Sequence, residues 1–331
     1  MTQSLTPERA PASAWNIAVI GAMNLDISAG SNQAFVPGDS TPGRITTTAG
    51  GVARNIAENL ARLGATAYLI SAVGDDLQSQ FLLDYTRSAG VDVSRCRIFP
   101  GHASGSYLSL YQQGGALLGA VNDMAVLNLL DPIELARHGD FVSAASAWVL
   151  DCNLCEASID WLMQCSQHAQ SAIPVFVDGV SSVKCRRILP WLQAVHTLKI
   201  NRLEAQTLTG LQVSDACQAQ TAAKNLCDRG VEIAVVSLGS GGVSWHQRSN
   251  NTSGHVPALA PTAINSNGAG DALTSGLVHG ALAGWPLTQS VRFANACAAS
   301  TMLSSSANSS DLSVANVARL LEKTPAGLIL P

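Results

Sequence analysis

The chain of 331 residues is 47% hydrophobic and 13% charged, with 23 acidic against 19 basic residues. It can bury a large core, which excludes a disordered chain or a small disulfide-stapled scaffold, and it offers no broad cationic field, so no nucleic acid is expected as a partner. Residues 1–14 lack the apolar stretch of a signal peptide, and no later run approaches the ~18 apolar residues of a membrane span. We therefore expect a cytoplasmic protein without a membrane partner, with a disordered tail over residues 1–14 and one folded domain over residues 15–331.

Short apolar runs alternate with segments of helical periodicity along most of the chain. The runs that predict buried strands cover residues 16–20, 67–73, 147–151, 174–178, 196–200 and 233–238. The segments that predict helices cover residues 52–63, 77–89, 159–163, 216–227, 269–283, 287–303 and 312–321. This alternation predicts an α/β fold, a doubly wound and mostly parallel sheet with helices on both faces.

Two stretches interrupt the alternation. Residues 27–48 are rich in Gly, Pro, Ser and Thr, and residues 106–121 have the pattern of a hairpin with Gly114 and Gly115 at its turn. The β-branched residues and alternating polarity of both stretches predict a small antiparallel sheet that projects from the edge of the main one. We expect this small sheet to act as a lid.

Polar residues and glycines suited to holding a small molecule follow the first strand and the lid. Asn24 and Asp26 come soon after the first strand, where a carboxylate can accept two hydrogen bonds from a vicinal diol; an ordinary Asx turn is the alternative. Gly50 and Gly51 precede a helix and permit close approach of a ligand. Asn55 lies on the first turn of that helix, where its amide can bind hydroxyl groups.

Two further motifs follow predicted strands. Asn201 and Glu204 are three residues apart, so on a helix they share one face and can position hydrated Mg²⁺ through oxygen ligands. A glycine-rich turn with Ser237, Gly239 and Gly242 can lie against a nucleotide. That turn has neither the Walker pattern G-x-x-x-x-G-K-[ST] nor the full G-x-G-x-x-G fingerprint, which disfavours a dinucleotide oxidoreductase.

The most informative segment opens the helix predicted from residue 269. Gly268, Ala269 and Gly270 form a turn whose backbone N–H groups can point at an anion, and the helix N-terminus adds positive potential. Asp271 places a carboxylate beside this anion hole. Such an arrangement suits a base that takes a proton from a nucleophile while the amides stabilise the developing charge, and an ordinary helix cap is the alternative.

Together these motifs, spread over residues 16–303, resemble the ribokinase or PfkB-type carbohydrate kinase family. The residues that resemble its two signatures are Gly50, Gly51, Asn55, Ala57, Leu60 and Gly64, then Gly268, Ala269, Gly270 and Asp271. The resemblance implies a ribokinase-like fold, ATP and Mg²⁺ as cofactors, and phosphoryl transfer to an alcohol. The second signature begins with Asn265 and Ser266 where the family has Asp and Thr. The family's monovalent-cation site lies beside that loop, so this departure leaves K⁺ as an open third cofactor.

Longer strings resemble the bacterial pseudouridine kinases within that family, and they cover residues 50–60, 106–110, 122–124, 151–153 and 197–205. By this resemblance a nucleoside is the substrate, and the ribose 5′-hydroxyl of pseudouridine receives the phosphoryl group of ATP. Asp26, Asn55 and the Gly50-Gly51 backbone would hold the ribose, and Asp271 would remove the 5′-hydroxyl proton.

Fewer residues indicate where the nucleobase of the acceptor and the adenine of ATP would bind. The residues implied to meet the nucleobase are Tyr107, Asn122, Asp123 and Asn153. For these, ordinary turn and packing roles are the alternative. Asn295, on the helix that runs beside the adenine in the family, is implied to bind the nucleotide.

Other readings of the same motifs remain open. Within the enzyme class, the acceptor could be ribose or another nucleoside, because specificity depends on a few lid and edge residues. A non-catalytic nucleoside or sugar sensor is the rival from another class, although a binding module has no need of a base facing an anion hole. The lid also predicts a homodimer, because exposed sheet edges are usually covered.

Overall fold

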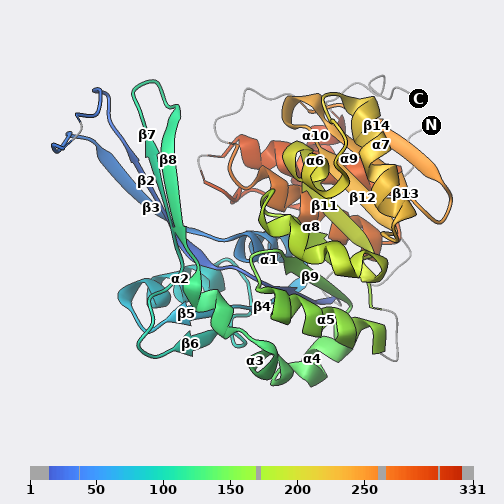
Figure 1. Cartoon of the computed structure of the whole chain (residues 1–331), viewed down its shortest axis with the longest axis horizontal. Helices are drawn as coiled ribbons and strands as arrows, with labels where there is room; N and C mark the ends of the chain where they lie inside the picture. The colour runs from blue at the N-terminus through green and yellow to red at the C-terminus, as the bar shows by residue number, and fades with distance from the viewer. Residues whose placement is uncertain (1–14, 37, 169–172, 260–265, 305, 323–331) are drawn as a thin grey trace.

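The computed structural model describes residues 15–322 except residues 37, 169–172, 260–265 and 305. The tail expected over residues 1–14, and Asn265 of the second signature, lie outside the described residues. Within them, a large and mostly parallel sheet is flanked by helices and carries a smaller sheet that projects from one side (Figure 1). The expected α/β class is confirmed.

The main sheet has the strand order β14-β13-β12-β11-β10-β9-β1-β4, and its strands run parallel from β12 to β4. These strands are β1 (Asn16–Ile20), β4 (Thr66–Ile70), β9 (Ala147–Asp151), β10 (Val175–Asp178), β11 (Thr197–Asn201), β12 (Ile233–Ser237), β13 (Val243–Gln247) and β14 (Thr252–Val256). β13 and β14 extend one edge in antiparallel fashion. Because parallel strands need crossover connections, helices cover both faces.

The helices form two layers. They are α1 (Val52–Arg62), α2 (Leu77–Ser88), α3 (Pro132–Ala136), α4 (Gly139–Ala144), α5 (Glu156–His168), α6 (Arg202–Thr209), α7 (Ala216–Asp228), α8 (Ala269–Leu282), α9 (Leu287–Met302) and α10 (Val314–Glu322), with 3₁₀ segments η2 (Ala125–Leu129), η3 (Lys184–Ala194) and η4 (Gly239–Gly241). Side chains alternate along β1: Ile17 and Val19 pack in the cluster of α1, α2 and α8, whereas Ala18 and Ile20 pack in that of α5, η3, α6 and α7.

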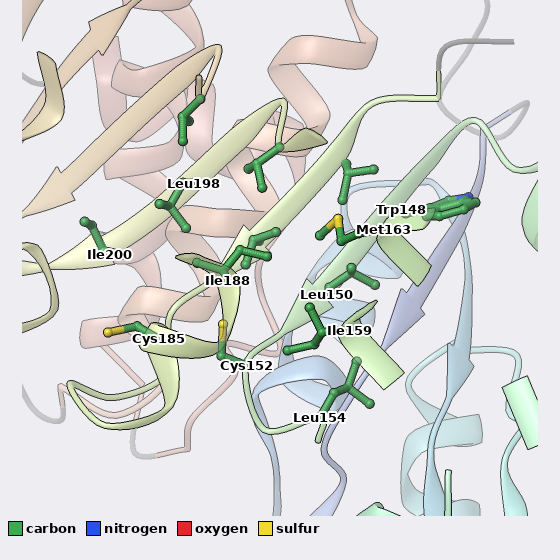
Figure 2. Packing of buried hydrophobic residues seen from close by; sticks show 14 of the residues in the cluster. Trp148, Leu150, Cys152, Leu154, Ile159, Met163, Cys185, Ile188, Leu198 and Ile200 are labelled. Carbon is green, nitrogen blue, oxygen red and sulfur yellow. The ribbon is translucent and has the colours of Figure 1, made fainter. Parts of the chain in front are cut away.

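Figure 2 shows part of the second layer. Trp148 and Leu150 of β9 pack in one continuous cluster with Ile159 of α5, Ile188 of η3 and Leu198 of β11, and each of these side chains is buried. Close packing of this kind resists displacement. It therefore holds the ends of the neighbouring strands, and the loops that follow them, at fixed positions.

The smaller sheet, which we call the lid, has the strand order β3-β2-β7-β8 and extends beyond the main sheet (Figure 1). Its strands are β2 (Asn24–Gly30), β3 (Arg44–Gly50), β7 (Ser106–Tyr111) and β8 (Leu117–Asp123). Gly114 and Gly115 at the predicted hairpin turn have φ angles of 88° and 81°, which explains why glycine stands at both positions.

Three features of the fold differ from the sequence prediction. The run 67–73 is two strands, because β4 ends at Ile70 and β5 (Ala72–Gly74) pairs with β6 (Arg97–Phe99) in a separate small sheet. The lid is mixed rather than antiparallel, since β2 and β7 pair in parallel. The hairpin of β13 and β14 was not predicted, because the sequence Thr-Ser-Gly-His-Val of β14 is short and mostly polar.

No helix in the part of the chain that the structure describes is long and apolar enough to cross a bilayer. All eight cysteines are free thiols.

Candidate active site

Polar residues end neighbouring strands at one edge of the main sheet. Asp151, Asp178, Asn201 and Ser237 are the last residues of β9, β10, β11 and β12. In parallel sheets the carboxyl ends of strands meet at the same edge, where ligands usually bind. The N-terminus of α8 reaches this edge, because Thr274 donates a hydrogen bond from its hydroxyl to Asp178 Oδ2 at 2.8 Å.

Asp271 lies in the first turn of α8 and is 9% exposed. Its Oδ2 accepts a hydrogen bond from Nδ2 of Asn55, on α1, at 2.7 Å. Burial, together with the negative charge of Asp178, raises the pKa of Asp271 to about 7, although Lys199 and the Asn55 hydrogen bond oppose this rise. A carboxylate with such a pKa can accept a proton near neutral pH.

A buried ion pair lies beneath the glycine turn. Lys199 Nζ is 3.0 Å from Asp178 Oδ2, and a Cβ added to Gly270 would lie only 2.7 Å from the same Nζ. Burial alone would lower the pKa of Lys199, but the charges of Asp178, Glu204 and Asp271 raise it, so the side chain is an ammonium. The turn of the second signature therefore lies over a fixed positive charge.

Sequence reasoning assigned no role to Lys199 or Asp178. A signal was present, because each is a charged residue within or at the end of a run that otherwise predicts a buried strand. Charged side chains are rarely buried unless they are paired. That rule predicts a partner for each residue, but the sequence does not say which.

On the lid side, the predicted ribose-binding residues lie together. Asn24 Nδ2 donates to Asp26 Oδ1 at 2.6 Å. A Cβ added to Gly50 would lie 2.2 Å from Asp26 Oδ2, and Gly51, with φ 101°, begins α1 against the carbonyl of Ala22. Neither glycine leaves room for a side chain, which accounts for the Gly-Gly pair.

Asp26 has two polar neighbours on the lid. The strand register places Tyr107 of β7 and Asn122 of β8 on the same face as Asp26. Asp123 is the next residue of β8 and faces the opposite side, where its Oδ1 accepts the N–H of Ala125 at 3.0 Å. Of the predicted base-contacting residues, Tyr107 and Asn122 therefore share a face with Asp26 and Asp123 does not.

Asn153 lies in the loop after β9 rather than in the lid. Its N–H donates to Asp151 Oδ1 at 2.8 Å and its own Oδ1 accepts from Lys184 Nζ at 2.7 Å. The other oxygen of Asp151 accepts the N–H groups of Ala22 and Ala53, each at 2.9 Å. Burial raises the pKa of Asp151 to about 6. Through these hydrogen bonds Asp151 joins the segment that precedes β2 and the start of α1 to the carboxyl ends of the strands.

A cavity of about 740 Å³ opens on the other side of the α8 N-terminus. The five residues predicted to bind the nucleotide line it: Asn201, Ser237, Gly239, Gly242 and Asn295. Lys199, Ala269 and Gly270 also line it. Asn295 is held in place by a hydrogen bond from its Nδ2 to the carbonyl of Pro257 at 2.8 Å.

The two predicted Mg²⁺ ligands contact each other. Asn201 Oδ1 accepts the N–H of Glu204 at 3.0 Å, and Glu204 Oε2 accepts the N–H of Asn201 at 2.9 Å, which makes a capping box at the start of α6. Among the described residues there is no cluster of three or more His, Cys, Asp or Glu that could hold a metal ion by itself. Mg²⁺ in phosphoryl transfer keeps several waters and takes phosphate oxygens, so one or two protein oxygens suffice.

Comparisons with known proteins identify the family of the chain. The family model described as pfkB family carbohydrate kinase matches residues 15–314. Pseudouridine kinase of Escherichia coli (strain K12) is 40% identical over 306 residues, 92% of this chain and 96% of that protein. Guanosine-inosine kinase of Exiguobacterium acetylicum is 27% identical over 262 residues, 79% and 86% of the two chains.

A solved structure shows the same fold. Arabidopsis thaliana ribokinase, complexed with ribose and ATP, matches with a TM-score of 0.83 at 20% identity and covers 94% of this chain and 100% of its own. The resemblance inferred from the two glycine signatures is confirmed: the chain belongs to the pfkB family of carbohydrate kinases.

Proposed function

We propose that the protein phosphorylates the ribose 5′-hydroxyl of pseudouridine with ATP. One observation carries the reaction type: Ala269 and Gly270 line the large cavity, whereas Asp271, the next residue of α8, contacts Asn55 on the lid side. The helix N-terminus therefore separates a nucleotide cavity from an acceptor site, with a base between them. The identity of 40% to a pseudouridine kinase over nearly the whole chain supports the acceptor.

The lid side would bind the nucleoside. Asp26, held by Asn24, accepts hydrogen bonds from two neighbouring ribose hydroxyls, and Asn55 binds the ribose through its amide. Tyr107 and Asn122 lie beside Asp26 on the polar face of the lid and meet the nucleobase. Closure of the lid over the site excludes water and so limits hydrolysis of ATP.

Asp271 accepts the 5′-hydroxyl proton as the oxygen attacks the γ-phosphorus of ATP, and the bond from that phosphorus to the bridging oxygen of the β-phosphate breaks to release ADP. Charge accumulates on the transferring phosphoryl group, and the backbone N–H groups at the start of α8 and the ammonium of Lys199 stabilise it. Little covalent help is needed in phosphoryl transfer, so these fixed charges and the positioning of the two substrates supply most of the acceleration.

ATP would occupy the cavity, with its adenine near Asn295 and its phosphates toward Gly270 and Lys199. Mg²⁺, when bound, neutralises charge on the phosphates, and Asn201 and Glu204 would orient its water shell. The K⁺ site stays a prediction, because it concerns the loop that contains Asn265.

Glu204→Gln is expected to raise the Mg²⁺ concentration for half-maximal rate by about 3–10-fold, because the carboxylate near the hydrated cation loses its charge. The variant should fold, since Gln also serves at this position of a capping box. A titration of the rate with Mg²⁺ at fixed ATP measures the effect, and Glu156→Gln, at an exposed position of α5, is the control. An unchanged Mg²⁺ dependence would remove Glu204 from the metal site.

We also propose a homodimer through the lid. The lid face opposite Asp26 carries Ile27, Ile45, Leu108, Leu110 and Val121 at matching register positions. Ile45 is 70% and Val121 68% exposed. Neighbouring exposed apolar side chains of this kind are typical of interaction sites, and a second lid offers a complementary apolar surface.

Val121→Glu is expected to shift the protein from dimer to monomer at micromolar concentration, because a charge would be buried within the interface. Sedimentation velocity measures the change. Ile133→Glu, at a 75% exposed position of α3, should leave the dimer intact. If wild type sediments as a monomer throughout, or if both variants behave alike, the lid is not the interface.

The acceptor is tested by comparing kcat/KM for pseudouridine, uridine, cytidine, adenosine, ribose and fructose 6-phosphate with saturating MgATP. Pseudouridine is expected to give the highest value. A higher value for ribose or another nucleoside would retain the kinase and replace the substrate. Binding without any phosphorylation would instead support the sensor reading.

A further inference from the structure

Arg54 is a buried cation beside the reaction centre. It precedes Asn55 on α1 and is 1% exposed. Its Nη1 donates to Glu58 Oε2 at 2.7 Å, and its Nη2 donates to Asn55 Oδ1 and to Asn308 Oδ1, the latter at 2.6 Å. A buried guanidinium is costly unless it is paired, so three acceptors around one side chain indicate a defined role.

The contact with Asn55 fixes the orientation of its amide. A guanidinium can only donate hydrogen bonds and an ionised carboxylate can only accept them. Arg54 therefore donates a hydrogen bond to Oδ1 of Asn55 on one side. On the other side, Asp271 Oδ2 accepts a hydrogen bond from Nδ2 of Asn55 at 2.7 Å. If the amide of Asn55 were rotated by half a turn, its N–H groups would face those of Arg54 and its oxygen would face the carboxylate of Asp271. Both contacts therefore select the same orientation.

Asn308 extends this network to the glycine turn. Its Nδ2 donates to the main-chain carbonyl of Asn55 and to Asn59 Oδ1, each at 2.9 Å. The carbonyl of the preceding residue, Ala307, lies so close to Gly268 that a Cβ there would be 1.8 Å from it. The segment after α9 is thereby docked both on α1 and on the turn that opens α8.

We propose that Arg54 is a positioning residue for phosphoryl transfer: through Asn55 it orients the carboxylate of Asp271, and through Asn308 it holds the turn that precedes that carboxylate. The proposal rests on Asp271 as the base of the reaction. The hydrogen bonds of Arg54 go to Glu58, Asn55 and Asn308, and none goes to Asp271. It acts through Asn55.

The charges that face Asp271 show what would change without Arg54. Burial and the negative charges of Asp178 on β10 and Asp151 on β9 raise the pKa of Asp271, and Lys199 on β11 and the hydrogen bond from Asn55 lower it. An amide that is free to rotate would present Nδ2 to the carboxylate for only part of the time. Loss of the guanidinium should therefore raise the pKa of Asp271 further.

The test is the pH dependence of kcat/KM for Arg54→Lys. Lysine keeps the charge but replaces the planar guanidinium by one ammonium nitrogen, so the fixed fork whose two nitrogens donate to Glu58, Asn55 and Asn308 is lost. The matched control is Arg62→Lys: Arg62 pairs with the same Glu58 but does not contact Asn55. The acidic limb of the Arg54→Lys profile is expected to lie about one pH unit higher than that of wild type, with kcat/KM at pH 7 about fivefold lower. The control should keep the wild-type limb. The substrates titrate identically in all variants, so a difference between profiles comes from the protein.

Melting temperatures separate this role from a purely structural one. If Arg54→Lys is less stable but keeps the wild-type limb, the guanidinium only supports the fold and the proposal is overturned. If that variant is unfolded at the assay temperature, Asn308→Ala decides, with an expected upward shift of about half a pH unit and an unmoved limb as the opposing result. If the profile of wild type has no acidic limb, Asp271 is not the base, and the role of Arg54 is overturned with it. If wild type has the limb and the variants show it at the same pH, only the role of Arg54 is overturned.

Discussion

Asp271→Asn is expected to lower kcat by about 10²–10⁴-fold, the usual cost of removing a general base. The substitution keeps the size of the side chain, and the new amide oxygen can still accept the hydrogen bond from Asn55. ATP and acceptor should therefore bind with dissociation constants within a few-fold of wild type. Rapid-quench measurement of phosphoryl transfer and calorimetric titration of both ligands separate the two effects.

The same variant has a predictable effect on stability. The pKa of Asp271 is 3.8 in its ordinary state and about 7 in the folded chain. Between these values the folded state keeps a proton that the unfolded state has lost, so the free energy of unfolding of wild type falls as pH rises through this window. Asp271→Asn removes that dependence. Its melting temperature at pH 8 should exceed that of wild type by about 2–5 °C, and the difference should shrink toward pH 4.

Two results would contradict this account. Turnover within a few-fold of wild type would exclude Asp271 as the base. A loss of turnover that accompanies a loss of ATP binding would indicate that the turn before Asp271 has collapsed. Asp228→Asn, at an exposed position of α7, is the matched control and should change neither turnover nor the pH dependence of stability.

The sequence predicts those features of the site that depend on neighbouring residues in the chain. Gly268 to Asp271 and Gly50 to Asn55 are contiguous motifs at helix starts, and their backbone requirements are visible in the residue types alone. Four of the nucleotide residues, Asn201, Ser237, Gly239 and Gly242, lie at or just after the ends of predicted strands, so the carboxyl-edge rule already places them together. Those predictions needed no knowledge of side-chain contacts.

The missed residues depend on contacts between distant segments. Lys199 pairs with Asp178 across two neighbouring strands, and Arg54 meets Asn308, 254 positions away in the chain. Periodicity assigns such residues to a strand or a helix but cannot choose their partners. The lid shows the same limit: its strands could be predicted from alternating polarity, whereas the parallel pairing of β2 with β7 is set by how the chain returns through α1, β4 and α2.

The second large effect concerns the acceptor, and it depends on one hydrogen-bond donor. Pseudouridine is joined to ribose through carbon, so its ring keeps an N1–H group that uridine, glycosylated at N1, lacks. Tyr107 and Asn122 on the polar face of the lid offer oxygen acceptors beside Asp26. A lid that closes on pseudouridine would pair one such acceptor with N1–H, away from water.

We expect kcat/KM for pseudouridine to exceed that for uridine by at least about tenfold, because an acceptor left buried and unpaired costs about 1–3 kcal/mol, or about 5–150-fold. Ribose should also be a poorer acceptor, since it lacks the base contacts that order the lid. If the side-chain amide of Asn122 supplies the acceptor, Asn122→Ala should lower kcat/KM for pseudouridine about tenfold and leave that for uridine nearly unchanged, so the preference should largely vanish. A preference that survives in this variant would exclude Asn122 as the residue that recognises N1–H, and equal values for the two nucleosides in wild type would show that the pocket does not distinguish the carbon-linked base from the nitrogen-linked one.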